Sequence, residues 1–169
     1  MADCLLVIDR DGTLIENEGY LGRENNWKTK IKLINKTVFL INSLDILFPN
    51  NLKIVFSNQT GVALRYFSEQ RVEEINNHVK LLLQKENIDI KHWIYSPEAD
   101  YAYAKQKKIK PNRYIKPVST RKPNPQLLLN LLKNLNYSLS YFKKRVVIGD
   151  SEDDELLSKN IDADYINIC

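Results

Sequence analysis

Cysteine and glycine are scarce in this chain of 169 residues, which has 2 cysteines, Cys4 and Cys169, and 5 glycines. The two cysteines form neither a disulfide framework nor the spaced thiol pairs of a metal site, which indicates a reducing compartment. Low-complexity linkers and internal repeats are missing. The start of the chain has neither a basic leader nor a long apolar run. We therefore predict no signal peptide or membrane span and expect a cytoplasmic protein.

Acidic residues are absent from one long stretch. Residues 101–149 contain no Asp or Glu but hold 12 of the 25 Lys and Arg, which leaves 13 bases against all 21 acids elsewhere. This asymmetry favours an anionic ligand near one region of the protein. The densest part is residues 105–116, KQKKIKPNRYIK. The alternative is a lysine-rich face that only interacts with solvent.

The overall composition is that of a globular protein. Hydrophobic residues make up 43% and charged residues 27% of the chain. At this length, one domain is large enough to bury most of its apolar surface. We therefore expect a single domain over residues 1–169, and a monomer.

Apolar runs of strand length alternate with segments of helical periodicity. Strands are predicted at 5–8, 52–57, 91–95, 145–149 and 163–169, and helices at 35–48, 68–87, 125–135 and 151–160. A long proline-containing loop is expected up to Pro123. Such alternation is typical of β-α-β units, so the predicted fold is a three-layer α/β/α Rossmann-like domain with a mostly parallel sheet.

The stretch LLVIDRDGTL contains the first apolar run, which is followed directly by two aspartates and a glycine. Asp9 and Asp11 would lie at the carboxyl end of a buried strand, where open α/β sheets bind their ligands. Two carboxylates so close repel each other unless a cation or a shared proton holds them together. The alternative is an aspartate-rich turn that caps the next element.

Three more polar stretches follow later strands or precede a helix. They are SNQTG at 57–61, RKPNP at 121–125 and GDSEDD at 149–154. Together the four stretches offer a nucleophile, hydroxyl and amide donors, a fixed cation and separated carboxylates. These are the groups that phosphoryl transfer requires, with a divalent cation such as Mg²⁺ to offset the charge.

In their order and their placement at strand ends, these stretches resemble the four motifs of the haloacid dehalogenase (HAD) superfamily of aspartate-nucleophile phosphatases. The sequences DRDGTLIENEGYL, SNQTGV and RKPNP are most similar to the branch that contains the heptose bisphosphate and histidinol-phosphate phosphatases. The resemblance covers residues 5–154. It implies a Mg²⁺-dependent phosphatase without a large cap domain, acting on a small phosphorylated substrate, with sugar phosphates favoured.

The resemblance also implies a role for each matching residue. Asp9 would be the nucleophile and Asp11 the general acid and base. Asp9, the backbone carbonyl of Asp11 and Asp150 would hold Mg²⁺. Asp154 would be an outer metal ligand or, equally, part of a helix start that favours negative charge. The other implied residues are Ser57 and Lys122 in catalysis, and Thr13, Asn58, Gln59 and Arg121 in substrate binding.

The sequence departs from these relatives at a structural zinc site. Many relatives hold zinc through Cys-x-His and Cys-x-Cys pairs, whereas the matching positions here read Ser96-Pro97-Glu98 and Val118-Ser119-Thr120. Because tetrahedral zinc needs such ligands, no structural zinc is expected. We expect prolines and aromatic residues to order the loop instead.

Two other functions remain open at this point. A polynucleotide 3′-phosphatase would use the same motifs, with the basic segment at 101–149 following the nucleic acid. A non-catalytic subunit that binds phosphorylated ligands is the second alternative, but such a subunit would be expected to lack Asp9 or Asp11, and both are present.

Overall fold

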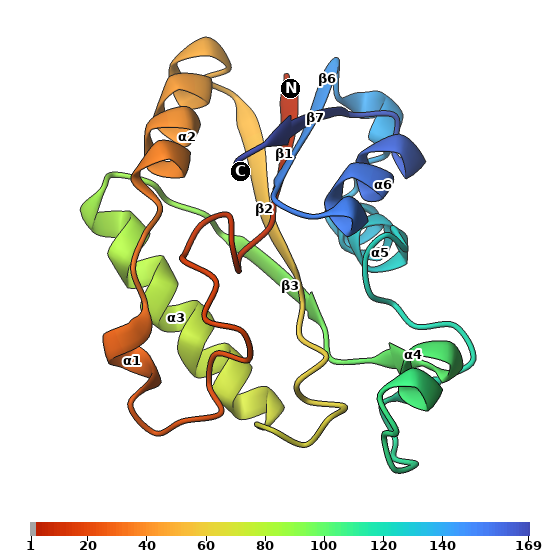
Figure 1. Ribbon diagram of the computed structural model, residues 1–169. Coiled ribbons are helices and arrows are strands. Elements are labelled where there is room, and N and C mark those ends of the chain that lie inside the picture. Colours follow the sequence, from red (N-terminus) through yellow and green to blue (C-terminus); the bar gives the residue numbers. More distant parts are fainter. Residues whose placement is uncertain (1–2) are drawn as a thin grey trace.

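The computed structural model describes residues 3–169 and contains one central parallel sheet (Figure 1). The five strands lie in the order β3-β2-β1-β6-β7. Their bounds are β1 Cys4–Ile8, β2 Asn51–Asn58, β3 His92–Ser96, β6 Lys144–Gly149 and β7 Asp164–Asn167. Strand β1 pairs with β2 on one side and β6 on the other, so the strands that precede Asp9 and Asp150 are neighbours.

Alternating side chains of β1 divide the core into two halves. Cys4, Leu6 and Ile8 belong to a cluster with residues of α2 (Asn35–Leu47) and α3 (Glu69–Lys85). Leu5 and Val7 belong to a second cluster with residues of α5 (Gln126–Asn134) and α6 (Glu152–Asn160). All five residues of β1 are buried, as expected for a central strand covered on both faces.

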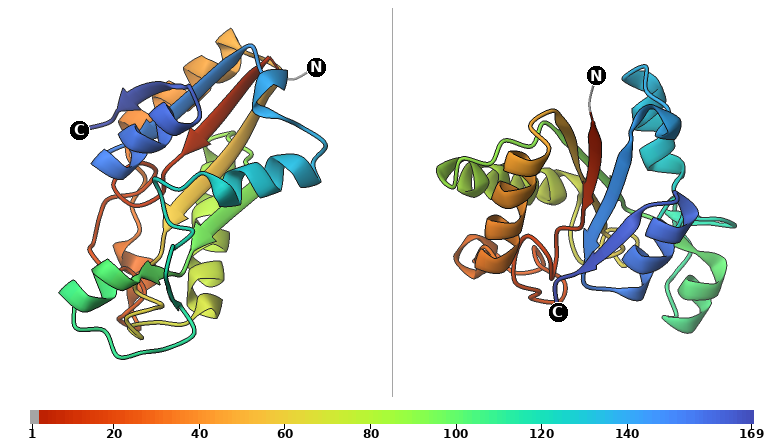
Figure 2. Two further views of the ribbon diagram at one scale, coloured as in Figure 1. Left: turned by 90° about the vertical axis from the view of Figure 1, so that its right-hand side faces the viewer. Right: turned by 90° about the horizontal axis from the view of Figure 1, so that it is seen from above.

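Helices therefore cover both faces of the sheet, and Figure 2 shows the resulting layers from above. Helices α2 and α3 lie on one side, with the short α1 (Trp27–Lys30), while α5 and α6 lie on the other. This confirms the predicted three-layer α/β/α fold with a parallel sheet. Among residues 3–169, the only helix between β1 and α2 is the four-residue α1, in agreement with the absence of a large cap.

Two predicted helix starts are formed by serine caps. The Ser68 side chain accepts a hydrogen bond from the backbone N–H of Arg71, which satisfies one of the free donors at the start of α3. At the start of α6, Ser151 and Asp154 form a reciprocal capping box. The capping box fixes where Asp154 lies.

The segment before Pro123 has more regular structure than the loop predicted from the sequence. It contains α4 (Tyr101–Gln106) and a separate two-stranded parallel sheet of β4 (Ala99–Asp100) and β5 (Ile115–Lys116). A six-residue helix and two-residue strands are too short to produce a detectable hydrophobic period. Within residues 3–169, no helix combines the length and apolar character needed to cross a bilayer.

Candidate active site

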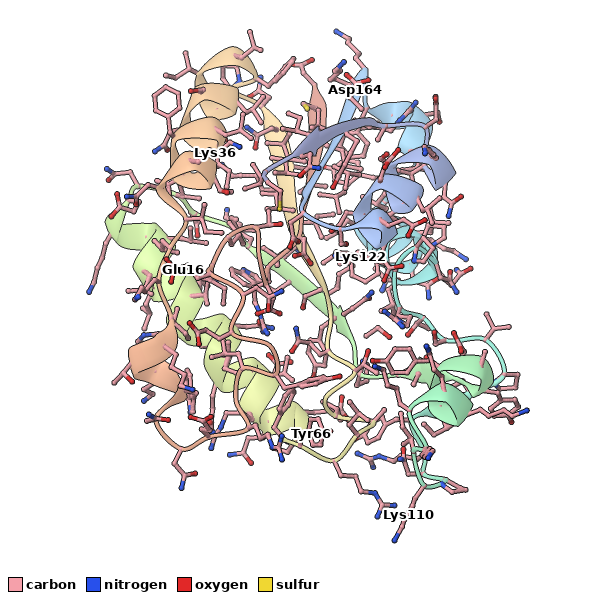
Figure 3. The ribbon with its side chains drawn as sticks, viewed as in Figure 1. Glu16, Lys36, Tyr66, Lys110, Lys122 and Asp164 are labelled. Carbon is pink, nitrogen blue, oxygen red and sulfur yellow. The ribbon has the colours of Figure 1, made fainter. Side chains whose placement is uncertain are left out.

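A cavity of about 250 Å³ opens at the carboxyl ends of β1, β2 and β6. We call it the central cavity. Lys122, labelled in Figure 3, projects into it from the segment before α5. The predicted site residues that line the cavity are Asp9, Asp11, Asn58, Gln59, Arg121, Lys122 and Asp150.

Lys122 joins two carboxylates at the base of the cavity. Its Nζ donates to Asp9 Oδ1 at 2.5 Å and to Asp154 Oδ1 at 2.5 Å. The Lys122 side chain is only 2% exposed, as is that of Asp154. One ammonium thus faces two buried carboxylates, so this group of three carries a net negative charge that attracts a further cation.

The pKa values follow from this burial. Loss of solvent raises the pKa of Asp9 to about 7, against the opposing effect of the Lys122 charge. Burial would lower the pKa of Lys122, but Asp9 and Asp154 outweigh it and raise the pKa, so Lys122 stays protonated. Burial also raises the pKa of Asp150. A divalent cation would favour the ionised form of these carboxylates.

The carboxylates are close enough to share one metal ion. One oxygen each from Asp9, Asp150 and Asp154 lie within 4.8 Å of one another. Thr13 Oγ1 donates to Asp150 Oδ1 at 3.3 Å and orients that carboxylate. Carboxylate oxygens in an open site suit Mg²⁺, which keeps several waters and substrate oxygens as ligands.

Asp154 differs from the other two because both of its oxygens already have partners. Oδ1 accepts from Lys122, while Oδ2 accepts from the Ser151 hydroxyl at 2.6 Å and from the Ser151 backbone N–H at 3.2 Å. Of the two roles predicted for Asp154, the helix-start role is confirmed, and the contact with Lys122 is an addition. Asp9 and Asp150 are the better candidates for direct metal ligands.

Ser57 has a buried hydroxyl with an unused hydrogen-bonding capacity. The residue is 1% exposed and its Oγ has no hydrogen-bond partner among residues 3–169. A buried hydroxyl without a partner costs free energy, so such a group in a native site points to a ligand. A phosphoryl oxygen would satisfy it.

Asn58 was predicted to contact substrate, but its side chain is bonded within the protein. Its Oδ1 accepts from the Lys122 backbone N–H at 2.7 Å, and its Nδ2 donates to the Lys122 carbonyl at 3.2 Å. Nδ2 also donates to Asp153 at 3.2 Å. The Asn58 amide therefore holds the backbone at Lys122, and because Asn58 also lines the cavity, its predicted contact with substrate stays a prediction.

Gln59 is also occupied by a protein contact. Its Nε2 donates to Asp11 Oδ2 at 2.7 Å. The same carboxylate accepts from Arg10 Nη2 at 2.9 Å and Nε at 3.2 Å, and the fully buried Arg10 is held in turn by Asn76 at 2.7 Å. In this structure Gln59 and Arg10 orient Asp11, which is the carboxylate predicted to transfer protons.

Arg121 lies at the wall of the cavity between an acid and an aromatic ring. Its Nη2 donates to Asp153 Oδ2 at 3.0 Å, and its guanidinium lies 4.8 Å from the centre of the Tyr103 ring. Its buried Nε has no partner among residues 3–169. Arg121 thus keeps one N–H donor without a partner in the described part of the chain, and its contact with a substrate stays a prediction.

Sequence reasoning missed several residues that shape the cavity. Asp153, within the stretch GDSEDD, was assigned no role in the site from the sequence, yet it lines the cavity and pairs with Arg121. Tyr20 and Tyr103 line its outer part. The sequence signal for Tyr103 was its position in the aromatic stretch before Arg121. Tyr20 lies in the stretch DRDGTLIENEGYL, whose resemblance to the phosphatase branch assigned it no role.

The basic segment 105–116 forms a second hollow beside the site. Residues 107–110 and 63–66 line a cleft of about 250 Å³, which we call the basic cleft, and its charged side chains are Arg65, Lys107, Lys108 and Lys110. Lys107 Nζ lies 6.0 Å from the centre of the Tyr103 ring, which also lines the central cavity. Figure 3 shows Lys110 and Tyr66 at the same end of the molecule as α4.

Comparison with known proteins assigns the family. The model of the family described as polynucleotide kinase 3 phosphatase matches residues 5–166. Because this match covers nearly the whole chain, the protein belongs to that phosphatase family. The fold and the family confirm the resemblance to HAD phosphatases that the motifs indicated.

Two named relatives extend the comparison. The chain is 25% identical over 154 residues to the D-glycero-beta-D-manno-heptose-1,7-bisphosphate 7-phosphatase of Pasteurella multocida, covering 91% of this chain and 74% of the relative. The enzyme of the same name from Haemophilus influenzae is 24% identical over 149 residues, covering 88% and 72%.

Solved structures agree on the fold. A protein described as a HAD-like phosphatase from Mesorhizobium loti superposes with a TM-score of 0.75 at 23% identity, covering 92% of this chain and 67% of the other. The D,D-heptose 1,7-bisphosphate phosphatase of B. bronchiseptica, complexed with magnesium and phosphate, gives a TM-score of 0.69 at 16% identity and covers 95% and 78%.

Proposed function

We propose that residues 1–169 act as one magnesium-dependent phosphomonoester hydrolase domain, which forms an aspartyl phosphate on Asp9. The observation that carries this proposal is the contact of Asp9 with Lys122 beside Asp150, at the ends of neighbouring central strands. We further propose a small phosphorylated metabolite as the substrate, with a sugar phosphate or heptose bisphosphate favoured. The names of the two bacterial relatives support that preference.

The first chemical step is attack of an Asp9 carboxylate oxygen on phosphorus. The bond from phosphorus to the leaving oxygen breaks, and Asp11 gives that oxygen a proton. Lys122, protonated and bonded to Asp9, holds the nucleophile and neutralises charge on the phosphoryl group. Ser57 donates to a phosphoryl oxygen, and Arg121 orients the rest of the substrate.

In the second step Asp11 removes a proton from water. The water oxygen attacks phosphorus, the bond to Asp9 breaks and inorganic phosphate leaves. Mg²⁺, held by Asp9, Asp150 and the backbone carbonyl of Asp11, would supply positive charge beside the phosphoryl oxygens. Arg10 and Gln59 hold the Asp11 carboxylate in place, which supports its role as the base toward water.

Hydrolysis of a panel of phosphomonoesters tests this proposal. The panel contains heptose 1,7-bisphosphate, other sugar phosphates and a 3′-phosphorylated oligonucleotide, each measured by phosphate release with Mg²⁺ and with EDTA. We expect turnover of a sugar phosphate with Mg²⁺ and its loss in EDTA, without any requirement for zinc. No turnover of any ester, or full activity in EDTA, would contradict it.

A substitution at Gly12 tests the proposed metal site, because a side chain added there would displace Asp150. Gly12 has φ +92°, and a Cβ there would lie 2.1 Å from Asp150 Oδ2. Gly12→Ala is therefore expected to displace Asp150 and raise the Mg²⁺ concentration for half-maximal activity by roughly tenfold or more. Gly19→Ala is the matched control, since Gly19 also has a positive φ, +69°, but nothing within 4 Å of its Cβ position. Equal effects of the two variants would exclude a role for the contact with Asp150.

A polynucleotide 3′-phosphatase is the second candidate, and the basic cleft favours it. The four cations of the cleft, with no acid among its lining residues, adjoin the Tyr103 wall of the central cavity. The family description names polynucleotide phosphatases as well. Binding to a nucleic acid backbone would follow from these charges.

Salt dependence separates the two substrate classes. For a metabolite phosphatase we expect weak binding of a 3′-phosphorylated oligonucleotide at 150 mM salt and a shallow salt slope. Micromolar affinity, with a log–log slope steeper than about −3, would instead establish the polynucleotide reading, because each neutralised phosphate of a single strand contributes about −0.7. Fluorescence anisotropy at two or more salt concentrations makes this measurement.

A further inference from the structure

The backbone that carries Lys122 lies outside regular secondary structure. Residues 119–122 precede α5 and follow β5, and they must present Lys122 to Asp9 and Arg121 to the cavity wall. Asn58 fixes this segment at Lys122 through two hydrogen bonds. A second attachment exists two residues earlier, at Thr120.

At Thr120 the attachment is a carboxylate. One oxygen of Glu98, Oε2, accepts from the Thr120 backbone N–H at 2.9 Å and from the Thr120 hydroxyl at 2.9 Å. The Thr120 hydroxyl has one proton, which this bond uses. Ser96 Oγ, 3.0 Å away, must therefore be the donor in its contact with Thr120 Oγ1.

The same serine closes a ring of hydrogen bonds. Ser96 Oγ accepts from the backbone N–H of Glu98 at 3.4 Å, so the donors run from Glu98 to Ser96, on to Thr120 and back to Glu98. Ser96 is fully buried at the end of β3, and its carbonyl accepts from the backbone N–H of Gln59 at 2.7 Å. The ring therefore connects the Lys122 segment to the ends of both β2 and β3.

We propose that Glu98 is a positioning residue, which sets the place of Lys122 and Arg121 in the site by holding the backbone at Thr120. This inference rests on the proposed function, since Lys122 and Arg121 act on the phosphoryl group and the substrate there. Glu98 itself does not line the central cavity. Its effect on catalysis passes through the main chain over two residues.

The role depends on an acceptor and not on a charge. Because a single oxygen of Glu98 receives both bonds, the carbonyl oxygen of a glutamine can take its place. Glu98→Gln is therefore expected to keep kcat/KM within about threefold of wild type. Glu98→Ala leaves the Thr120 N–H without its partner, and a shift of Lys122 of the order of 1 Å lowers kcat/KM roughly 10- to 100-fold.

A matched control is available in Glu69. Its carboxylate also ties the segment before Lys122 to the body of the protein, through Tyr114 at 2.7 Å and Arg113 at 3.4 Å, but several residues away from Thr120. If any loosening of this segment were sufficient to reduce activity, Glu69→Ala would reduce it as much as Glu98→Ala. We expect Glu69→Ala to stay within about threefold of wild type, because a surface pair contributes little.

The experiment measures kcat and KM for p-nitrophenyl phosphate with Mg²⁺ in all three variants and in Thr120→Val, together with thermal unfolding and amide hydrogen exchange of residues 119–122. We expect Glu98→Ala and Thr120→Val to lose kcat and to exchange faster at 119–122, with recovery in Glu98→Gln. Should Glu98→Ala not fold, Glu98→Met takes its place, because methionine keeps the side-chain length but offers no oxygen acceptor.

Two results would overturn the inference: wild-type kcat and exchange in Glu98→Ala, or equal damage in Glu98→Gln and Glu98→Ala. If the wild-type protein hydrolyses no ester, the proposed function fails. Exchange at 119–122 then still tests the attachment by itself.

Discussion

Replacing Asp9 with asparagine is expected to lower kcat by roughly 10⁴-fold or more, because a neutral amide is no nucleophile toward phosphorus. The fold should persist, since Lys122 keeps its second partner, Asp154. Phosphate release from the best substrate of the panel, measured at saturating Mg²⁺, gives the rate.

Two further variants show whether the loss of activity in Asp9→Asn is specific to the nucleophile. Asp164→Asn is the control, because Asp164 pairs with Lys144 on the surface and should retain wild-type activity. Asp11→Asn should slow both chemical steps while inorganic phosphate still binds, since Asp11 transfers protons and does not form the covalent bond. Wild-type turnover in Asp9→Asn would rule out the covalent route.

Replacing Lys122 with methionine is expected to affect stability as well as activity. The substitution leaves Asp9 and Asp154 buried without their shared cation, and loss of one partner from a buried ion pair costs about 3–5 kcal/mol of unfolding free energy. Activity should fall to background at the same time. Urea unfolding in EDTA, monitored by circular dichroism, measures the stability.

Two comparison variants separate the effect of burying this ion pair from the effect of losing one positive charge on the free energy of unfolding. Lys53→Met removes a lysine that pairs with Asp45 at 2.6 Å nearer the surface, and we expect a loss of about 0–1 kcal/mol. Adding Asp154→Asn to Lys122→Met should recover stability but not activity, because it removes one uncompensated carboxylate. A Lys122→Met protein as stable as wild type would mean that this ion pair does not hold the site together.

Much of the fold could be predicted from the sequence because the central strands are continuously apolar. The run at 5–8 and the run at 145–149 both fit strands covered on two faces, and they are neighbours in the sheet. Their carboxyl ends then bring Asp9 and Asp150 together without further information. The serine caps at Ser68 and Ser151 are local signals of the same kind.

The parts that could not be predicted depend on contacts between distant segments. Asn58 follows a strand in a phosphatase motif, so its residue type suggested a ligand contact, whereas its partner is the main chain at Lys122. The fully buried Arg10 was missed because its partner Asn76 lies 66 residues away in α3. The 96–121 segment is held in part by the aromatic residue Tyr114, which donates to Glu69. It is held in part by Glu98 and Thr120, which the expectation of prolines and aromatic residues did not include.

Trapping the covalent intermediate tests whether Asp9 is the nucleophile. Asp11→Asn protein is mixed with substrate and Mg²⁺, quenched in acid and reduced with borohydride, which converts an aspartyl phosphate into homoserine. Peptide mass spectrometry then locates the modified position. We expect homoserine at position 9, only when substrate and Mg²⁺ are both present. Homoserine at another aspartate, or none at all while the protein turns over substrate, would contradict it.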